Sequence, residues 1–181
     1  MVKEKGIKEK LGLVHVYTGD GKGKTTAALG LALRAMGNDL RVAMVQFMKC
    51  PQVYGEYEIS GSLPNFTLLP MGRDCLVNVK KPAPEDIEAA SQALAKADQL
   101  LKSGEYDMVI LDEVNVAISW DLVKVEDVVR LVKERPPQVE VVLTGRYAPQ
   151  PILDLADLVT EMRCIKHPYE KGVPARAGIE R

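Results

Sequence analysis

The chain has 181 residues, and its 24 lysines and arginines against 25 aspartates and glutamates argue against a surface built to bind nucleic acid or anionic lipid. Hydrophobic residues make up 46% of the sequence, which excludes disorder as the overall state, and a chain this long can bury roughly 70% of its unfolded surface within one domain. No apolar run reaches the roughly 20 residues of a membrane span, and no signal-like stretch follows the basic start, so we expect a cytoplasmic protein with no membrane partner.

A charged segment opens the chain. Residues 1–12 alternate lysine and glutamate and carry too little apolar surface to fold alone, so they are expected to form an N-terminal tail or lid. The rest of the sequence has no internal repeat and no low-complexity linker. Residues 13–181 are therefore predicted to be one domain.

A strand, a glycine-rich loop and a helix come next. Leu13–Tyr17 is a short apolar run typical of a strand, and an alanine- and leucine-rich run predicts a helix that extends to Met36. Gly37 and Asn38 are expected to end that helix, because both residue types tolerate positive φ. Arg41–Phe47 is predicted to be the next strand, which completes a βαβ unit.

The middle of the chain is predicted to be mostly loop. Prolines and glycines interrupt residues 48–84, and only Phe66–Leu69 has the pattern of a short strand. Pro84 then begins a helix that continues to Gly104, since apolar residues recur on one face at helical spacing. These positions are Ile87, Ala90, Leu94, Ala97 and Leu101.

Strands and helices alternate in the second half. Met108–Leu111 is a continuous apolar run, which is typical of a strand covered on both faces. A helical stripe of valines follows, and then strands at Val139–Leu143 and Leu158–Met162 with a short helix at Pro151–Ala156 between them. The valines are Val125, Val128, Val129 and Val132. This order predicts an α/β fold with a mostly parallel sheet flanked by helices on both faces, and ligands at the carboxyl ends of the strands.

The loop after the first strand carries the strongest chemical signal. Its glycines allow backbone N–H groups to surround phosphate oxygens, the Lys24 ammonium would contact the phosphates, and the Thr25 hydroxyl would bind Mg²⁺ or Mn²⁺. The predicted nucleotide-binding residues are Gly19, Asp20, Gly21, Lys22, Gly23, Lys24, Thr25 and Thr26. Thr18 stands where the usual motif has its first glycine, and a glycine-rich turn without a ligand is the alternative. Between a strand and a helix, this loop predicts the P-loop NTPase architecture of RecA-like proteins.

Three charged residues are expected at the same edge of the sheet. Asp112 and Glu113 follow a buried strand and, with Thr25, are the predicted metal ligands, although only one of the two carboxylates needs to bind. The alternative is that both carboxylates face solvent at a helix N-terminus, where negative charge is favourable. Arg146 follows a third strand, where a contact with phosphate or ribose and a surface ion pair are equally well supported. His15 is expected to be a packed or hydrogen-bonded core residue rather than a metal ligand.

A phosphate-binding loop alone leaves phosphoryl transfer, hydrolysis and plain nucleotide binding open. The sequence carries a longer series of motifs, which are Tyr17–Ala28, Val45–Lys49, Ile110–Glu113, Leu143–Arg146, Leu153–Met162, Lys166–Pro168 and Gly178–Glu180. In this order and spacing the series resembles the P-loop class of ATP:corrinoid adenosyltransferases, which act on cob(I)alamin or cob(I)yrinic acid a,c-diamide. The resemblance covers about Leu13 to Glu180, nearly the whole chain.

The resemblance implies a reaction in which a reduced Co(I) corrinoid attacks the 5′ carbon of ATP and triphosphate is released. It implies catalytic roles for Lys24, Thr25 and Glu113: the loop and Lys24 offset negative charge on the triphosphate, and Thr25 and Glu113 hold Mg²⁺. Lys22 would add a further positive charge. The family also suggests a homodimer and a flavoprotein that reduces the corrinoid.

Two stretches depart from the family. Its well-known members displace the lower axial ligand of the corrinoid with aromatic residues of a Gly-Phe-Thr-Trp stretch, and the corresponding residues 72–76 here are Gly-Arg-Asp-Cys-Leu. Either Leu76 and Val77 form the apolar wall, or the corrinoid pocket is built differently, or the substrate is a precursor without the nucleotide loop. Family members can cover the site with their N-terminus, whereas residues 1–12 are short enough that they would do so only across a dimer interface.

A few other residues near these motifs have two interpretations each. Cys75 is expected to be an ordinary thiol rather than a cobalt ligand, because it has no neighbouring ligand in the sequence. Tyr54 and Tyr57 could line a flat macrocycle or simply pack the loop, and Trp120 is expected to anchor a helix or loop to the core.

Two other functions stay open from the residues alone. A small P-loop kinase or NTPase needs only the glycine-rich loop and the Asp112–Glu113 pair. A nucleotide-gated module that delivers a corrinoid without turnover is favoured by the missing aromatic residues. The products formed from ATP would distinguish these functions from adenosyl transfer.

Overall fold

Six parallel strands form the centre of the protein. The computed structural model describes residues 6–50, 54–75 and 77–180, and within these ranges the strands pair in the order β3-β2-β4-β5-β1-β6. Every pair is parallel, which confirms the predicted α/β class. The strands are β1 (Val14–Thr18), β2 (Val42–Gln46), β3 (Phe66–Pro70), β4 (Met108–Asp112), β5 (Glu140–Thr144) and β6 (Leu158–Glu161).

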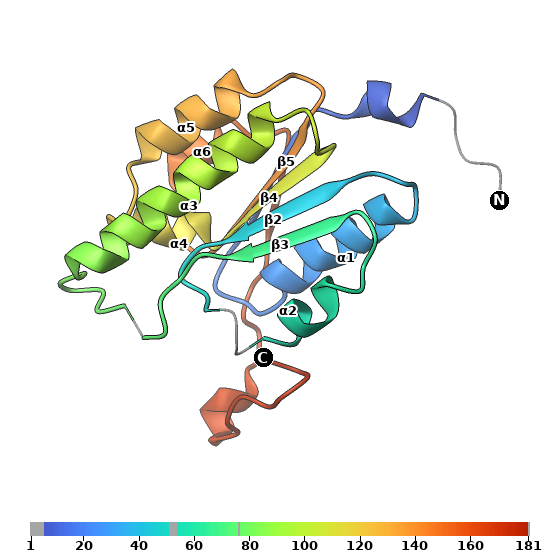
Figure 1. Cartoon of the computed structure of the whole chain (residues 1–181). Coiled ribbons are helices and arrows are strands. Elements are labelled where there is room, and N and C mark those ends of the chain that lie inside the picture. Colours follow the sequence, from blue (N-terminus) through green and yellow to red (C-terminus); the bar gives the residue numbers. More distant parts are fainter. Residues whose placement is uncertain (1–5, 51–53, 76, 181) are drawn as a thin grey trace.

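Helices cover both faces of this sheet (Figure 1). The helix α1 packs on one face, and α3, α4 and α5 pack on the other. The helices are α1 (Lys24–Met36), α2 (Gly55–Ser60), α3 (Pro84–Lys102), α4 (Val114–Ser119), α5 (Val125–Glu134) and α6 (Gln150–Leu153), with short 3₁₀ helices η1 (Ile7–Lys10) and η2 (Pro168–Lys171). No helix in the described part of the chain has both the length and the hydropathy of a membrane span.

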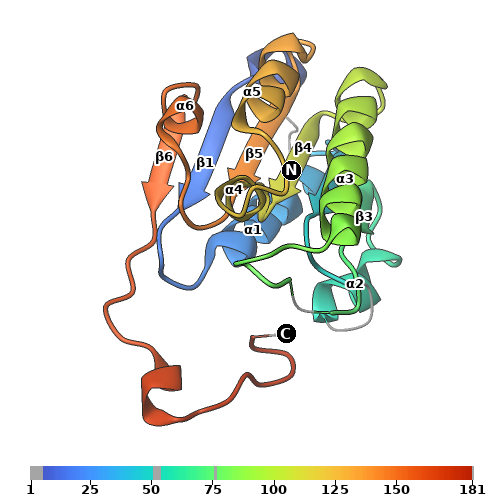
Figure 2. The ribbon, with the colours of Figure 1, turned by 90° about the vertical axis from the view of Figure 1, so that its left-hand side faces the viewer.

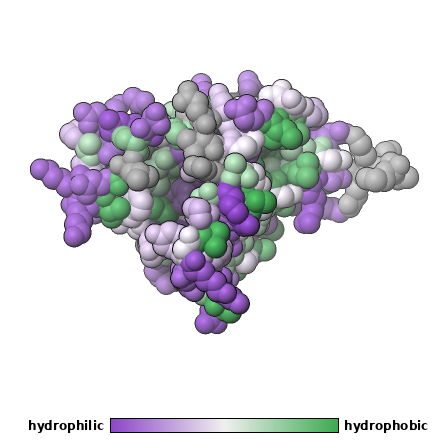
Figure 3. All heavy atoms as spheres, turned by 90° about the horizontal axis from the view of Figure 1, so that it is seen from below, coloured by the Kyte–Doolittle hydropathy of each residue, from purple (hydrophilic) through white to green (hydrophobic). Residues whose placement is uncertain are grey.

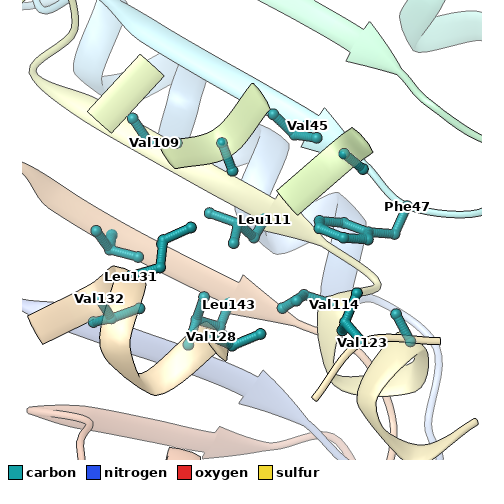
Figure 4. Close-up of a cluster of buried hydrophobic side chains, with 14 of the residues drawn as sticks. Val45, Phe47, Val109, Leu111, Val114, Val123, Val128, Leu131, Val132 and Leu143 are labelled. Carbon is teal, nitrogen blue, oxygen red and sulfur yellow. The ribbon is translucent and has the colours of Figure 1, made fainter. Parts of the chain in front are cut away.

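The side chains of β4 show how one strand contributes to two cores. Met108 and Ile110 pack with the alanines of α1, and Val109 and Leu111 pack on the opposite face with α3 and α5. All four are buried, as the continuous apolar run predicts. Figure 4 shows the second core, in which Leu131 of α5 lies close to the strand residues. Burying each side chain of this size stabilises the fold by about 1.5–3 kcal/mol relative to leaving it exposed.

The buried face of α3 differs from the predicted one at its beginning. Ile87 is 44% exposed, although helical spacing placed it on the apolar stripe. The first turns of α3 extend beyond the ends of the strands (Figure 1), so the start of the helix has less of the sheet to pack against. Farther along the helix, the small side chains of Ala90, Ala93 and Ala97 are buried against the strands.

Other local predictions also need correction. Residues 48–84 contain the helix α2 in addition to the expected loop and strand, and α4 follows Glu113 where no helix was assigned. Each of these helices has six residues, too few for a clear helical period. Gly37 remains right-handed, with φ −59°, because its N–H still donates to the Leu33 carbonyl. The positive φ of 60° falls two residues later, at Asp39.

The carboxyl ends of the strands bring the predicted chemical signals together. Figure 2 shows the arrowheads of β1, β5 and β6 pointing toward the C-terminal segment of the chain. The glycine-rich loop follows β1, Asp112 ends β4 and Thr144 ends β5. The prediction that these signals meet at one edge of the sheet is therefore confirmed.

The N-terminal segment lies at the opposite edge (Figure 1). Lys8 of η1 holds its Nζ atom 2.8 Å from Oδ1 of Asp107, just before β4. Residues 1–5 of the predicted tail or lid lie outside the described residues. The described part of that segment is thus attached far from the glycine-rich loop of its own chain, and its role stays a prediction.

Glu140, the first residue of β5, attaches the N-terminal segment to the sheet. Its Oε2 accepts hydrogen bonds from the amides of Gly12 (2.7 Å) and Leu13 (2.8 Å), and its Oε1 lies 2.7 Å from Nε2 of His15. The prediction of a hydrogen-bonded core histidine is confirmed. Burial raises the pKa of Glu140, but the hydrogen bonds from His15 and the two amides outweigh it, so the pKa lies below its usual value.

Replacing Glu140 by glutamine is expected to destabilise the protein by about 1–3 kcal/mol at pH 7, because hydrogen bonds to a charged acceptor are lost. The stabilisation by the carboxylate is fully present above its unfolded-state pKa of about 4.3 and is lost as the pH falls through the lower folded-state pKa. The difference between wild type and Glu140→Gln should therefore shrink in acid. Urea unfolding at pH 7 and near pH 3 tests this, and an equal difference at both pH values would contradict it.

Candidate nucleotide-binding site

The glycine-rich loop joins β1 to α1 and packs against the segment that follows β6. Gly19 and Gly23 have φ values of 93° and 120°, a region that side chains disfavour. A Cβ atom at Gly19 or Gly21 would lie only 2.4 or 2.7 Å from the Met162 carbonyl oxygen, so neither position has room for a side chain. The Gly21 N–H donates to the same oxygen at 2.7 Å. The Gly21 amide is thus directed at Met162.

Lys24 begins α1 and folds back over the loop. Its ammonium donates to the carbonyl oxygens of Gly19 (2.8 Å) and Gly21 (2.6 Å), and the residue is only 7% exposed. Burial lowers the pKa of Lys24; the negative charge of Glu113 opposes this shift and the positive charge of Arg146 reinforces it. The loop carbonyls therefore hold this charge at the N-terminus of α1, where anions bind favourably.

Asp112 is the centre of a buried polar network. Its Oδ1 accepts hydrogen bonds from the hydroxyls of Thr25 (2.9 Å) and Thr144 (2.7 Å). Its Oδ2 accepts from Lys49 Nζ (2.8 Å) and from Gln46 Nε2 (3.1 Å). The residue is fully buried, and four donors satisfy a carboxylate that would otherwise be costly to bury. Asp112 therefore does not turn into solvent, which was the alternative from the sequence.

Glu113 differs from its neighbour in lining a cavity. Its φ of 64° is left-handed, and its N–H donates to Thr144 Oγ1 at 3.0 Å. Such a conformation costs a non-glycine residue of order 1 kcal/mol or more, and strain of this kind is typical of functional sites. Burial raises the pKa of Glu113, and the nearby charge of Asp112 raises it further, whereas Lys49 lowers it. The Glu113 carboxyl group therefore loses its proton less readily than usual, and a cation bound beside it would stabilise the charged form.

Lys49 and Gln46 join this network although the sequence analysis gave them no role. Both lie in a quoted family motif, at and just beyond the end of β2, which pairs with β4 next to Asp112. Polar residues at the end of the adjacent strand were the signal that could have found them. Burial lowers the pKa of Lys49, but the charge and hydrogen bond of Asp112 outweigh it and raise the pKa overall. Lys49 therefore stays an ammonium.

A cavity of about 560 Å³ opens beside the loop. Most of the predicted nucleotide-binding residues line it: Gly21, Lys22, Gly23, Lys24, Thr25, Thr26 and Arg146. Glu113 and Lys49 line it as well, and Tyr54 and Glu56 contribute from the start of α2. Figure 3 looks onto this edge of the sheet and shows hydrophilic and hydrophobic side chains interleaved across the face. The cavity is therefore lined by charged residues next to the glycine-rich loop, and the surface around it combines polar and apolar side chains.

The C-terminal segment forms one wall of this cavity, where His167, Gly178, Ile179 and Glu180 reach it. Lys22 Nζ donates to the Ile179 carbonyl (2.9 Å) and to Glu180 Oε1 (3.1 Å). Hydrogen bonds from Arg176, with a further one from Lys22, hold the pKa of Glu180 well below its usual value. The sequence analysis quoted His167 and Gly178–Glu180 as motif residues without a role.

Asp20, one of the predicted nucleotide-binding residues, bonds to the protein backbone and does not line the cavity. Its Oδ1 accepts a hydrogen bond from the backbone N–H of Cys164 at 3.2 Å. Together with the bond between Gly21 and Met162, this contact ties the glycine-rich loop to the chain beyond β6. In this structure Asp20 thus fixes the loop rather than lining the cavity.

A second cavity, of about 570 Å³, adjoins the first. The two cavities share four residues: Lys49, Tyr54, Glu113 and Arg146. The other lining residues are mostly apolar or aromatic: Phe47, Met48, Cys75, Val77, Val79, Val116, Trp120 and Tyr147. Leu76, one of the two predicted wall residues, lies outside the described residues. The shared boundary means that a ligand in each cavity could meet near Glu113 and Arg146.

The donor atoms at the loop fit a magnesium ion. The hydroxyl of Thr25 and the carboxylates of Asp112 and Glu113 are hard oxygen ligands, and Thr25 Oγ1 already lies 2.9 Å from Asp112 Oδ1. Within the described ranges no group of three or more histidine, cysteine, aspartate or glutamate side chains could hold a metal ion. Nucleotide-site Mg²⁺ usually takes one or two carboxylates and completes its shell with phosphates and water.

Comparisons with known proteins point to one family. The sequence model described as ATP:corrinoid adenosyltransferase BtuR/CobO/CobP matches residues 10–181. A corrinoid adenosyltransferase of Sinorhizobium sp is 38% identical over 193 residues, which cover 99% of this chain and 89% of the relative. The corrinoid adenosyltransferase of Escherichia coli K12 is 36% identical, with 95% of this chain and 87% of the relative covered. The corrinoid adenosyltransferase CobA of Salmonella typhimurium LT2 is 35% identical at the same coverage.

Proposed function

The chain belongs to the ATP:corrinoid adenosyltransferase family BtuR/CobO/CobP and is a corrinoid adenosyltransferase, and we propose that its reaction takes place where the two cavities meet. ATP and a corrinoid are its substrates. The observation that carries the proposal is the set of four residues common to both cavities, because one substrate in each would bring a ribose and a cobalt atom together there. The attacking atom is Co(I), so no protein nucleophile is needed.

The first cavity is proposed to hold the triphosphate of ATP as the leaving group. The loop amides other than that of Gly21, the N-terminus of α1 and the Lys24 ammonium would offset the negative charge that develops on the triphosphate. Lys24 Nζ lies on the loop carbonyls of Gly19 and Gly21, within reach of a phosphate oxygen by a side-chain rotation. Lys22, Lys49 and Arg146 line the same cavity.

Thr25, Asp112 and Glu113 are proposed to hold Mg²⁺, which would neutralise part of the charge of the leaving triphosphate. Thr25 and Asp112 already share a hydrogen bond, so their oxygens are positioned by the buried network. Thr144 supports the Asp112 carboxylate and the Glu113 backbone, since its hydroxyl donates to Asp112 Oδ1 and accepts from the Glu113 N–H. These contacts preorganise the ligands before any substrate binds.

The second cavity is proposed to hold the corrinoid. Its apolar lining fits a flat macrocycle: Val77, one of the two predicted wall residues, directly follows the stretch that corresponds to the family's aromatic residues, and Trp120 comes from the end of α4. Arg73, which stands where the family has phenylalanine, pairs with Asp86 at 2.9 Å. Cys75, which stands where the family has tryptophan, lines the cavity. The apolar surface is thus assembled differently from the one that the family pattern implies.

Replacing Trp120 by alanine is expected to raise KM for the corrinoid about tenfold and to leave KM for ATP nearly unchanged, because the indole contributes apolar contact only in the second cavity. Steady-state kinetics with each substrate varied in turn measures both constants. A rise confined to KM for ATP would place the corrinoid elsewhere.

The resemblance and the composition support three further proposals: a flavoprotein that reduces the corrinoid, a homodimeric assembly, and a cytoplasmic location. The N-terminal segment, attached at the far edge of its own sheet, is proposed to act as a lid only on a second subunit.

The products formed from ATP test the reaction. Incubation with ATP, Mg²⁺ and chemically reduced cobalamin or cobinamide is expected to yield an adenosylated corrinoid and an equal amount of triphosphate. Chromatography of the nucleotide, phosphate and corrinoid products measures the ratio. ADP and phosphate without adenosylated corrinoid would indicate the kinase or NTPase alternative, and tight corrinoid binding without turnover would indicate a binding module.

A further inference from the structure

The proposed function leaves the position of the Lys49 side chain unexplained. The ammonium lies 2.8 Å from Asp112 Oδ2 and 3.3 Å from Thr25 Oγ1, between two of the groups that are proposed to bind Mg²⁺. The side chain is only 11% exposed, and that of Asp112 is fully buried. A positive charge belonging to the protein itself thus sits on the oxygens of the proposed metal site.

The ammonium and a metal ion cannot share these oxygens. Mg²⁺ binds its oxygen ligands at about 2.0–2.1 Å, so an ion bound by Thr25 and Asp112 would lie within contact distance of the present position of Lys49 Nζ. Two cations that close together repel strongly in a partly buried site, where water screens the charges poorly. The metal can enter only if the Lys49 side chain moves.

The structure offers a second position for the ammonium. Glu56 Oε1 lies 3.8 Å from Lys49 Nζ, and the centroid of the Tyr54 ring lies 4.9 Å away. Both residues line the nucleotide cavity, as Lys49 does. A rotation of the side chain would therefore carry the charge from Asp112 toward Glu56 and the proposed triphosphate without moving it into solvent.

The backbone of Lys49 is fixed, so only its side chain is free to make this movement. The Gly72 N–H donates to the Lys49 carbonyl at 2.8 Å. A Cβ atom at Gly72 would lie 2.3 Å from the Lys49 backbone nitrogen, so the two segments pack without space between them. Gly72 thus holds the base of the side chain close to both positions of the ammonium.

We propose that Lys49 is an internal counterion that occupies the metal site of the nucleotide-free enzyme and leaves it only when the cation arrives together with the triphosphate. The inference rests on the proposed metal ligands. It adds that the site selects the metal–nucleotide complex over the free cation. When a free divalent cation displaces Lys49, the ammonium loses its ion pair with Asp112 and gains no new negative partner. A metal–nucleotide complex brings its own phosphates, and their negative charge pairs with the displaced ammonium. The enzyme would therefore bind free divalent cations weakly and the metal–nucleotide complex well.

Titration of the nucleotide-free protein with Mn²⁺, followed by electron paramagnetic resonance of the free ion, tests this inference. Lys49→Met is expected to bind Mn²⁺ at least about tenfold more tightly than the wild type, because the competing charge is gone. Adding Asp112→Asn to Lys49→Met should reverse the gain. Lys22→Met is the matched control: it removes a lysine from the same cavity, but Lys22 contacts Ile179 and Glu180 and not the metal ligands.

Two results would overturn the inference: an unchanged Mn²⁺ affinity in Lys49→Met, or an equal gain in Lys22→Met, which would show only a general effect of charge. Lys49→Gln keeps a hydrogen-bond donor for Asp112 and takes the same titration if Lys49→Met does not fold. The readout is independent of turnover, so a failure here would leave the adenosyl transfer measured with the wild type unaffected.

Discussion

Replacing Lys24 by methionine is expected to lower kcat/KM for adenosyl transfer about 10²–10³-fold, the usual effect of removing one preorganised charge-stabilising donor. The ammonium lies where the glycine-rich loop meets α1, and two carbonyls of the loop hold it there. It is therefore a positive charge positioned beside the proposed triphosphate site. Methionine is unbranched and only one atom shorter than lysine, so it keeps most of the apolar packing without the charge. Initial rates of adenosylated corrinoid formation, measured with both substrates varied, give the ratio of kcat/KM.

The Lys24→Met protein should stay folded, because the loss of two hydrogen bonds from a charged donor, about 1.5–3 kcal/mol each, is partly offset by no longer burying an ammonium. Thermal unfolding by circular dichroism checks this. Lys22→Met is the control for a general loss of positive charge: Lys22 lines the same cavity but is held by the C-terminal segment, so its loss should lower kcat/KM much less. An unfolded Lys24→Met protein, or equal losses in the two variants, would contradict the role assigned to Lys24.

The sequence predicted the layers of the fold well, because those elements carry clear periodic patterns. β4 is apolar at every position from Met108 to Leu111 and is buried on both faces. The stripe of valines placed α5 correctly, and its Val128 and Val132 are fully buried. Patterns of this kind depend only on neighbouring residues, so they can be read without knowing the tertiary structure.

The elements that the sequence missed are helices of six residues each, and α4 owes its conformation to tertiary packing. α4 has five buried residues in a six-residue helix, so its sequence has no exposed face to reveal a period. α2 begins after Tyr54 without a side-chain cap. Ile87 had the right spacing but is exposed, because helical spacing does not show where the sheet ends. Local propensity fails where packing decides the outcome.

The candidate site was predicted where a motif specifies backbone chemistry and was incomplete where distant segments meet. The glycine-rich loop and Asp112 could be found because their residue types follow from phosphate and metal chemistry. The contact of Lys49 with Asp112 spans 63 positions, and that of Lys22 with Glu180 spans 158. Polar residues at the end of β2 mark Lys49 as a candidate for the site, but neither pairing follows from the local sequence, so only the fold shows which carboxylate each lysine contacts.

Replacing Asp112 by alanine is expected to destabilise the protein by about 3 kcal/mol and to abolish measurable adenosyl transfer. Truncating one member of a buried ion pair leaves the other charge unpaired, which costs about 3–5 kcal/mol when no other partner is available. Lys49 retains Glu56 at 3.8 Å, so we expect the lower end of that range. The hydroxyls of Thr25 and Thr144 also lose their common acceptor. Urea unfolding measures the stability, and corrinoid product formation measures the activity.

Asp112→Asn separates the two effects, because it keeps an oxygen for the Thr25 and Thr144 hydroxyls but loses the charge. A smaller loss of stability than in Asp112→Ala is therefore expected, since fewer buried groups stay unsatisfied. The loss of activity should remain nearly as large, because a neutral amide is a poor ligand for Mg²⁺ and a poor partner for the Lys49 ammonium. An Asp112→Ala protein as stable as the wild type would mean that the buried network does not hold this edge of the sheet together. Full activity in Asp112→Asn would mean that the carboxylate charge has no part in binding the metal.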